Sequence, residues 1–289
     1  MSSSNSEPRP MYWSIQREIW ENRSVYIAPI IVAAVVLFGT FITIITVPMR
    51  TRGLGNTARL HALATPFRMA PAPIMLCTFL VGLYYCLDAL YGERRERSIL
   101  FWKSLPVSDR TTVLSKAAIP FVVLPSIAYA LSVIAQVLLL FASTVAARAG
   151  GMSVVGAWSE LRFFESLYVM AYGLVVHALW FAPVYGYLML ISGWAKRAAF
   201  LWVVLPPLAL MALERIVTGT TLFGSLLRYR VTGAMTLAFR CRLHDRGSCQ
   251  DYDLTPGKFL SSPGLWLGLM FAAACLFAAI RLRRNREPI

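Results

Sequence analysis

The chain has 289 residues, of which 57% are hydrophobic and only 15% are charged. A soluble domain carries about 25% charged residues, and a soluble fold of this length could not cover so much apolar surface. The 28 Lys and Arg exceed the 14 Asp and Glu, which gives a net charge of +14. In a membrane protein such an excess is typical of cytoplasmic loops and of contacts with anionic lipid headgroups. Composition therefore predicts an integral membrane protein with membrane lipids as partners.

The N-terminal region precedes the first long apolar stretch. Residues 1–9 are polar and predict a disordered tail. Residues 10–23 place Tyr12, Ile15 and Ile19 on one helical face, with tryptophans beside it. This pattern is typical of an amphipathic helix that lies on the membrane surface. A plain extension of the first membrane span is the alternative.

Six stretches provide the roughly 20 apolar residues that a transmembrane helix needs. They are about 25–47, 72–91, 117–145, 167–192, 199–217 and 262–282. The fourth and fifth stretches are separated only by GWAKRA, which predicts an antiparallel hairpin. The segment 218–261 is too charged to span, although residues 222–239 within it have helical apolar spacing. We therefore expect an all-α integral membrane protein in which residues 10–289 form a single six-helix transmembrane domain.

Six spans put both termini on one side of the membrane. With cytoplasmic termini, 15 Lys and Arg lie in the inner segments and 12 in the outer loops, and the inner charges sit close to the helix ends, where they set orientation most strongly. The same assignment places Cys241 and Cys249 in the oxidising compartment. No CxxC motif and no Cys/His cluster with zinc spacing is present, so the pair predicts a disulfide rather than a metal site.

The segment 92–116, between the second and third spans, surrounds an apolar cluster with charged residues. Residues 93–104 predict a short cytoplasmic helix that ends before Pro106, because the residue preceding a proline avoids helical geometry. Apolar anchors among charges predict a docking surface for another protein, and a solvated basic loop is the alternative. The candidate docking residues are Glu93, Arg94, Arg95, Glu96, Arg97, Ile99, Leu100, Phe101, Trp102 and Pro106.

The run ILFWKSLPVS, followed by LSK at the start of the third span, resembles the permeases of ABC exporters in the ABC-2 membrane family. The resemblance implies the six-helix fold of type V exporters, with counterparts of the connecting helix in 10–23, of the coupling helix in 93–104 and of an outer helical excursion in 222–239. It further implies a homodimer in the bacterial inner membrane that binds separately encoded ATP-binding subunits. ATP and Mg would then lie on those partner subunits.

The chain itself contains no GxxxxGK[ST] motif, so it has no phosphate cradle and is not predicted to be an enzyme by itself. An intramembrane hydrolase is disfavoured because HExxH and GxSxG are both missing. A proton- or ion-coupled secondary transporter and a non-transporting anchor or receptor for an ATPase remain as alternatives. No nucleic-acid partner is expected, because the basic residues are scattered over both predicted membrane faces.

Two polar residues within the predicted spans are candidates for a substrate path. Gln136 lies in the middle of the third span and His177 in the middle of the fourth. Polar and ionisable groups inside a membrane are costly and by default indicate function. For His177, a hydrogen bond between helices is the alternative.

Overall fold

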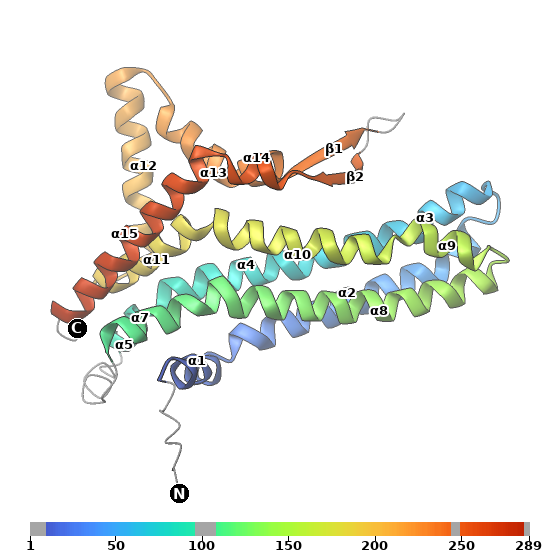
Figure 1. Cartoon of the computed structure of the whole chain (residues 1–289), viewed down its shortest axis with the longest axis horizontal. Helices are drawn as coiled ribbons and strands as arrows, with labels where there is room; N and C mark the ends of the chain where they lie inside the picture. Colours follow the sequence, from blue (N-terminus) through green and yellow to red (C-terminus); the bar gives the residue numbers. More distant parts are fainter. Residues whose placement is uncertain (1–9, 96–107, 244–248, 286–289) are drawn as a thin grey trace, which may run out of the picture. The chain divides into compact units, whose positions relative to one another are not determined.

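The computed structural model describes residues 10–95, 108–243 and 249–285, except for the side chains of Pro10 and of 241–252. The predicted tail 1–9 and most of the predicted docking segment therefore lie outside the described residues. Within the described part, the chain is helical apart from one two-stranded antiparallel sheet (Figure 1). Six helical stretches are long and apolar enough to cross a membrane. This confirms the prediction of an all-α, multi-pass membrane protein.

The helices follow one another closely along the chain. Those before the gap at 96–107 are α1 (Pro10–Glu21), α2 (Ser24–Arg50), α3 (Asn56–Met69), α4 (Pro71–Asp88) and α5 (Tyr91–Arg95). Those after it are α7 (Asp109–Ala118), a π-helical turn (Ile119–Val123), α8 (Leu124–Ala149), α9 (Val154–Leu161), α10 (Phe163–Trp180), α11 (Ala182–Trp194), α12 (Ala199–Thr218) and α13 (Leu222–Ala238). The strands β1 (Phe239–Leu243) and β2 (Cys249–Leu254) come next, and α14 (Pro256–Leu260) and α15 (Pro263–Asn285) end the described chain.

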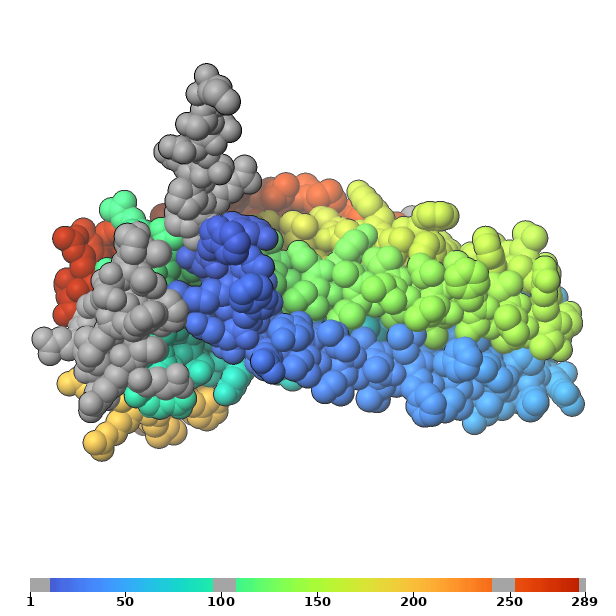
Figure 2. Space-filling view, turned by 90° about the horizontal axis from the view of Figure 1, so that it is seen from below, coloured from blue at the N-terminus to red at the C-terminus, as the bar shows by residue number. Residues whose placement is uncertain are grey.

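The chain divides into two compact units. Unit 1 contains residues 1–23, 82–122 and 176–289, and unit 2 contains 24–81 and 123–175. In unit 2, α2 and α8 run side by side (Figures 1 and 2). Their core includes Ile44 of α2 and Leu139 of α8, and α3 and α9 extend it with Phe67 and Leu161. All four of these side chains are almost completely buried.

Unit 1 is organised around α11 and α15. A Cβ atom at Gly186 would lie 3.1 Å from both Cα and O of Ala272, so glycine allows the two helices to approach closely. Trp180, at the end of α10, is fully buried and donates a hydrogen bond from Nε1 to the carbonyl oxygen of Arg230 in α13 at 2.7 Å. The Arg230 guanidinium also lies 4.6 Å from the Trp180 ring, which fixes α13 against this tryptophan.

The stretch 167–192, which the sequence predicts as one span, lies in two helices. The helix α10 ends at Trp180 and α11 begins at Ala182, with Phe181 between them. Pro183 is the second residue of α11, where its missing N–H leaves no hydrogen bond unmade. A proline at this position starts a new helix more readily than it continues an old one.

The segment 218–261 contains α13, the β-hairpin and α14. The helix α13 occupies most of the range for which helical spacing was expected, whereas no pattern predicted the hairpin. In the hairpin, Cys241 pairs with Tyr252 and Leu243 pairs with Cys249. The two cysteines are therefore not opposite each other in the backbone register. Their side chains lie outside the described part of the structure, and the disulfide stays a prediction.

Candidate functional site, a buried ion network

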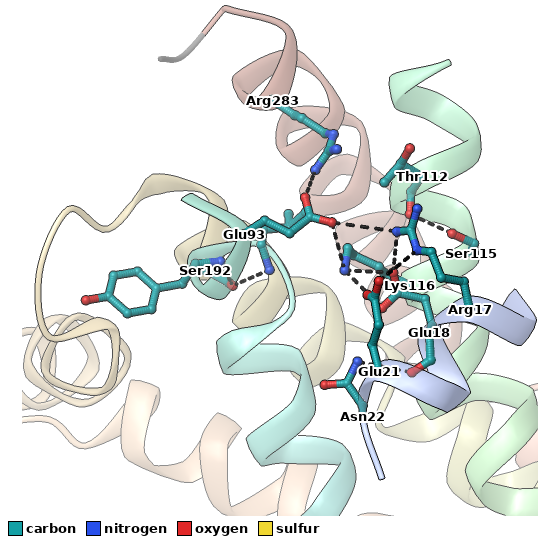
Figure 3. A network of polar contacts seen from close by, with 12 residues as sticks. Arg17, Glu18, Glu21, Asn22, Glu93, Thr112, Ser115, Lys116, Ser192 and Arg283 are labelled. Atoms are coloured by element: carbon teal, nitrogen blue, oxygen red, sulfur yellow. Dashed lines mark hydrogen bonds and ion pairs between the residues drawn. The ribbon is translucent and has the colours of Figure 1, made fainter. Parts of the chain in front are cut away.

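Four helices of unit 1 bring charged side chains together in a network (Figure 3). Its members come from α1, α5, α7 and α15, of which α1 and α15 lie near opposite ends of the chain. The members are Arg17, Glu18, Glu21, Glu93, Asp109, Lys116 and Arg283. We call this set the ion network. Its most buried part consists of two carboxylates and two cations, so the buried charges balance.

The helix α1 has a buried polar face, which carries Glu18, and an exposed aromatic face. Ser14 and Glu18, one turn apart, are buried, whereas Tyr12, Trp13 and Trp20 are more than half exposed. Exposed tryptophan and tyrosine side chains favour the membrane–water interface. The helix thus presents aromatic residues outward and packs its polar stripe against α7. The amphipathic helix expected from the sequence is present at Pro10–Glu21.

Glu18 lies at the centre of the ion network and is completely buried. Its Oε1 lies 2.9 Å from Nη2 of Arg17, and its Oε2 accepts a hydrogen bond from the Tyr85 hydroxyl at 2.8 Å. The Lys116 ammonium lies 2.9 Å from each of the two oxygens. A carboxylate has about four lone-pair sites. These contacts fill all of them, which is how the fold accommodates a charge that is otherwise costly to bury.

Lys116 connects Glu18 to a second carboxylate. Its side chain is only 3% exposed, and Nζ lies 3.2 Å from Oε1 of Glu93. A buried ammonium needs such partners, because an isolated charge in a low-dielectric interior would lose its proton or disrupt the fold. The two carboxylates, one from α1 and one from α5, therefore depend on the same cation from α7.

Arg283 of α15 closes the other side of the network. It forms an ion pair with Glu93, and its Nε lies 3.2 Å from Oδ1 of Asp109. Asp109 is the first residue of α7, where Oγ of Ser108 accepts a hydrogen bond from the amide of Thr111 at 3.1 Å. Glu93 comes just before the undescribed segment 96–107 and Asp109 just after it. A single guanidinium thus holds both ends of the predicted docking segment.

A second set of contacts fixes α5 to the end of α11. Arg94 is 5% exposed and donates from Nη1 to the carbonyl oxygens of Gly193 and Ala195 at 2.8 and 3.2 Å. A cation at the C-terminal end of a helix is favoured by the helix dipole. Oγ of Ser192 accepts hydrogen bonds from the amides of Leu90 and Tyr91 at 3.0 and 2.9 Å, which satisfies donors at the start of α5.

The structure brings some predicted docking residues into this site and does not describe others. Glu93 and Arg94 are internal anchors, and the Arg95 guanidinium lies 5.8 Å from the Tyr91 ring on an exposed position. Glu96, Arg97, Ile99, Leu100, Phe101, Trp102 and Pro106 all lie outside the described residues. Their contact with a partner remains a prediction.

The two candidates for a substrate path belong to different units. Nε2 of His177, in unit 1, lies 2.9 Å from the Tyr185 hydroxyl oxygen. The two residues form a hydrogen bond between α10 and α11, and a hydrogen bond between helices was the alternative to a substrate contact. Gln136 of unit 2 donates from Nε2 to Oγ of Ser166 in α10 at 2.6 Å. Each residue has a local partner that accounts for its polar side chain, and the substrate path stays a prediction.

No family model, no curated protein and no solved structure matches the chain. Among the residues that the structure describes, no group of three or more His, Cys, Asp or Glu side chains could hold a metal ion. The contacts of the ion network join charged side chains of different helices.

Proposed function

We propose that the chain is the transmembrane subunit of an ATP-driven ABC exporter of the ABC-2 type, in the bacterial inner membrane with both termini cytoplasmic. The observation that carries this proposal is the position of the ion network. Arg283 binds Glu93, the first residue of the segment 93–104 whose sequence resembles a coupling helix, and Asp109, which follows that segment. A segment that receives force from a motor needs both of its ends fixed to the helices that must move.

In this proposal, the apolar side chains of 99–102 dock into a separately encoded ATP-binding subunit, and a homodimer carries two such subunits. ATP and Mg supply the energy on those partners. Closure of the two motors displaces the docking segment, and the displacement enters α5 and α7 together because Glu93, Lys116 and Arg283 link them. The amphipathic α1 follows through Glu18, which contacts the same lysine.

The test is affinity purification of the tagged full-length chain from its native membranes, with identification of any chain that contains a phosphate-binding loop. The variant F101A/W102A removes the apolar anchors. The variant F164A/Y168A removes two exposed aromatic residues of unit 2 and is the matched control. The wild type and the control should copurify with the ATP-binding chain. With F101A/W102A, the amount of copurified ATP-binding chain should fall by at least about tenfold, because each apolar anchor of an interface contributes about 2 kcal/mol or more to binding.

Two outcomes would contradict the proposal. Recovery of no ATP-binding chain with the wild type would favour a secondary transporter. Equal recovery with F101A/W102A would place the motor contact elsewhere. An anchor or receptor without transport is separated by reconstitution, because only an exporter should show ATP hydrolysis in sealed vesicles that rises when its substrate is supplied.

A further inference from the structure

One end of unit 2 collects arginines from three helices. The helix α2 ends at Arg50, α8 ends at Ala149, and the loops that follow them lie together. A Cβ atom at Gly150 would lie 3.0 Å from Cβ of Pro48, and Nη2 of Arg59 in α3 donates to the carbonyl oxygen of Gly150 at 2.6 Å. We call Arg50, Arg52, Arg59 and Arg148 the arginine end.

The charges at this end do not balance. Residues 48–71 and 146–166 contain six arginines and two glutamates. Glu160 lies 3.9 Å from Arg68 and 3.6 Å from His61, and Glu165 forms an ion pair with Arg162. Both carboxylates are thus already engaged. Among the described residues, no ion pair is formed by any of the four members of the arginine end, and all but Arg59 have exposed side chains.

Apolar and aromatic side chains surround these cations. Leu54 and Trp158 are each 54% exposed, and Met49 is more exposed still. Trp158 donates from Nε1 to Oγ1 of Thr144 at 3.0 Å, which holds the indole at the end of α8. Tryptophan prefers the depth of the lipid headgroups. The helix α2 has 27 residues, or roughly 40 Å of length, and therefore extends past a hydrocarbon core of about 30 Å.

We propose that the arginine end binds the phosphate groups of anionic phospholipids. A guanidinium matches a phosphate with two parallel hydrogen bonds, and it is weakly hydrated enough to work at an interface. Cations that form no ion pair among the described residues, together with exposed Trp158, Met49 and Leu54, fit a headgroup attached to acyl chains. It fits a soluble anion poorly, because a soluble anion offers nothing to cover the apolar side chains. This inference is independent of the proposed transport function.

The experiment uses the full-length chain in nanodiscs of phosphatidylcholine that contain a small fraction of photoreactive phosphatidylglycerol. Crosslinked peptides are mapped by mass spectrometry. In the wild type, crosslinks should concentrate in peptides that cover 48–60 and 145–160. In the variant R50Q/R52Q/R148Q, the yield of these crosslinks should fall by on the order of fivefold for each arginine removed. This is the effect expected for one cation near an anionic membrane surface.

The matched control is R110Q/R215Q/R228Q, which removes three exposed arginines of unit 1 and should leave the crosslinks at the arginine end unchanged. Gel filtration of each variant checks that it remains folded. Equal crosslinking by a photoreactive phosphatidylcholine, or no loss in R50Q/R52Q/R148Q, would overturn the proposal. Suppression of the crosslinks by excess inorganic phosphate would instead assign the site to a soluble anion and would equally overturn it.

Discussion

Replacing Glu18 by Gln tests the ion network directly. The substitution preserves the size of the side chain but removes the charge that faces Lys116 at 2.9 Å and Arg17 at 2.9 Å. Lys116 is then left with Glu93 as its carboxylate partner, at 3.2 Å, and the buried part of the network gains a net positive charge. Removing one partner of a buried ion pair costs about 3–5 kcal/mol, a factor of roughly 10² to 10⁴ in the unfolding equilibrium.

The assay is unfolding of the purified chain in mixed micelles, where a denaturing detergent is increased and the tryptophan fluorescence is recorded. Glu21→Gln is the matched control, since Glu21 lies on the same helix, is 45% exposed and contacts Arg17 at 3.4 Å. A surface pair contributes at most about 1 kcal/mol. The two variants should therefore differ by at least about 2 kcal/mol in the free energy of unfolding.

The double variant E18Q/K116M removes both charges and leaves Glu93 paired with Arg283. Replacing a whole buried pair is often nearly neutral, so the double variant should be more stable than E18Q alone. Equal losses in E18Q and E21Q, or strictly additive losses in the double variant, would show that the network is not energetically coupled and would refute this reasoning.

Three further predictions concern other parts of the chain. Partial burial raises the pKa of the half-exposed Glu21 carboxyl above its ordinary value of 4.5. The free energy of unfolding should therefore fall as the pH rises from about 4.5 through the raised pKa, and Glu21→Gln should abolish this part of the pH dependence. Gly186→Ala should destabilise unit 1 by about 1–3 kcal/mol in the same assay, because the new methyl group meets the α15 backbone, whereas Gly39→Ala, with open space around it, should not. With cytoplasmic termini, alkaline phosphatase inserted after Gly53 should be active and green fluorescent protein fused to Ile289 should fluoresce; the reverse pattern would invert the topology.

The spans could be predicted from sequence because their signal is local. Hydrophobic length alone identified α2, α12 and α15, for which the bilayer sets both composition and extent. The break at Phe181 was missed, since the stretch remains apolar through it. Pro183 was the available signal, and a proline near a helix start is easily confused with one tolerated inside a transmembrane helix. The β-hairpin was missed because its strands are short and charged.

The ion network could be predicted only in part. Glu93 and Arg94 stood out because they lie in an unusually charged segment, but they were interpreted as surface groups that orient a partner. Their actual contacts are internal. Arg94 contacts Gly193 and Glu93 contacts Arg283, and both partners are distant in the sequence, although Glu93 also contacts the nearer Lys116. Lys116 and Arg283 lie at the ends of apolar stretches, where a basic residue normally marks orientation toward the cytoplasm. Sequence alone cannot distinguish a lysine that meets headgroups from one that meets a buried carboxylate.

The nature of these contacts bears on how force could pass through unit 1. Apolar packing is non-directional, so a segment held only by apolar contacts could slide against its neighbours. The network instead joins α1, α5, α7 and α15 through buried charged groups, whose attraction at low dielectric is strong and falls when they are separated. If α5 or α7 is displaced at the end that adjoins 96–107, Arg283 and Lys116 must move with it, or else buried charges are separated. Because separation costs several kcal/mol, the four helix ends are expected to move as one body, which is the property that a docking segment between α5 and α7 requires.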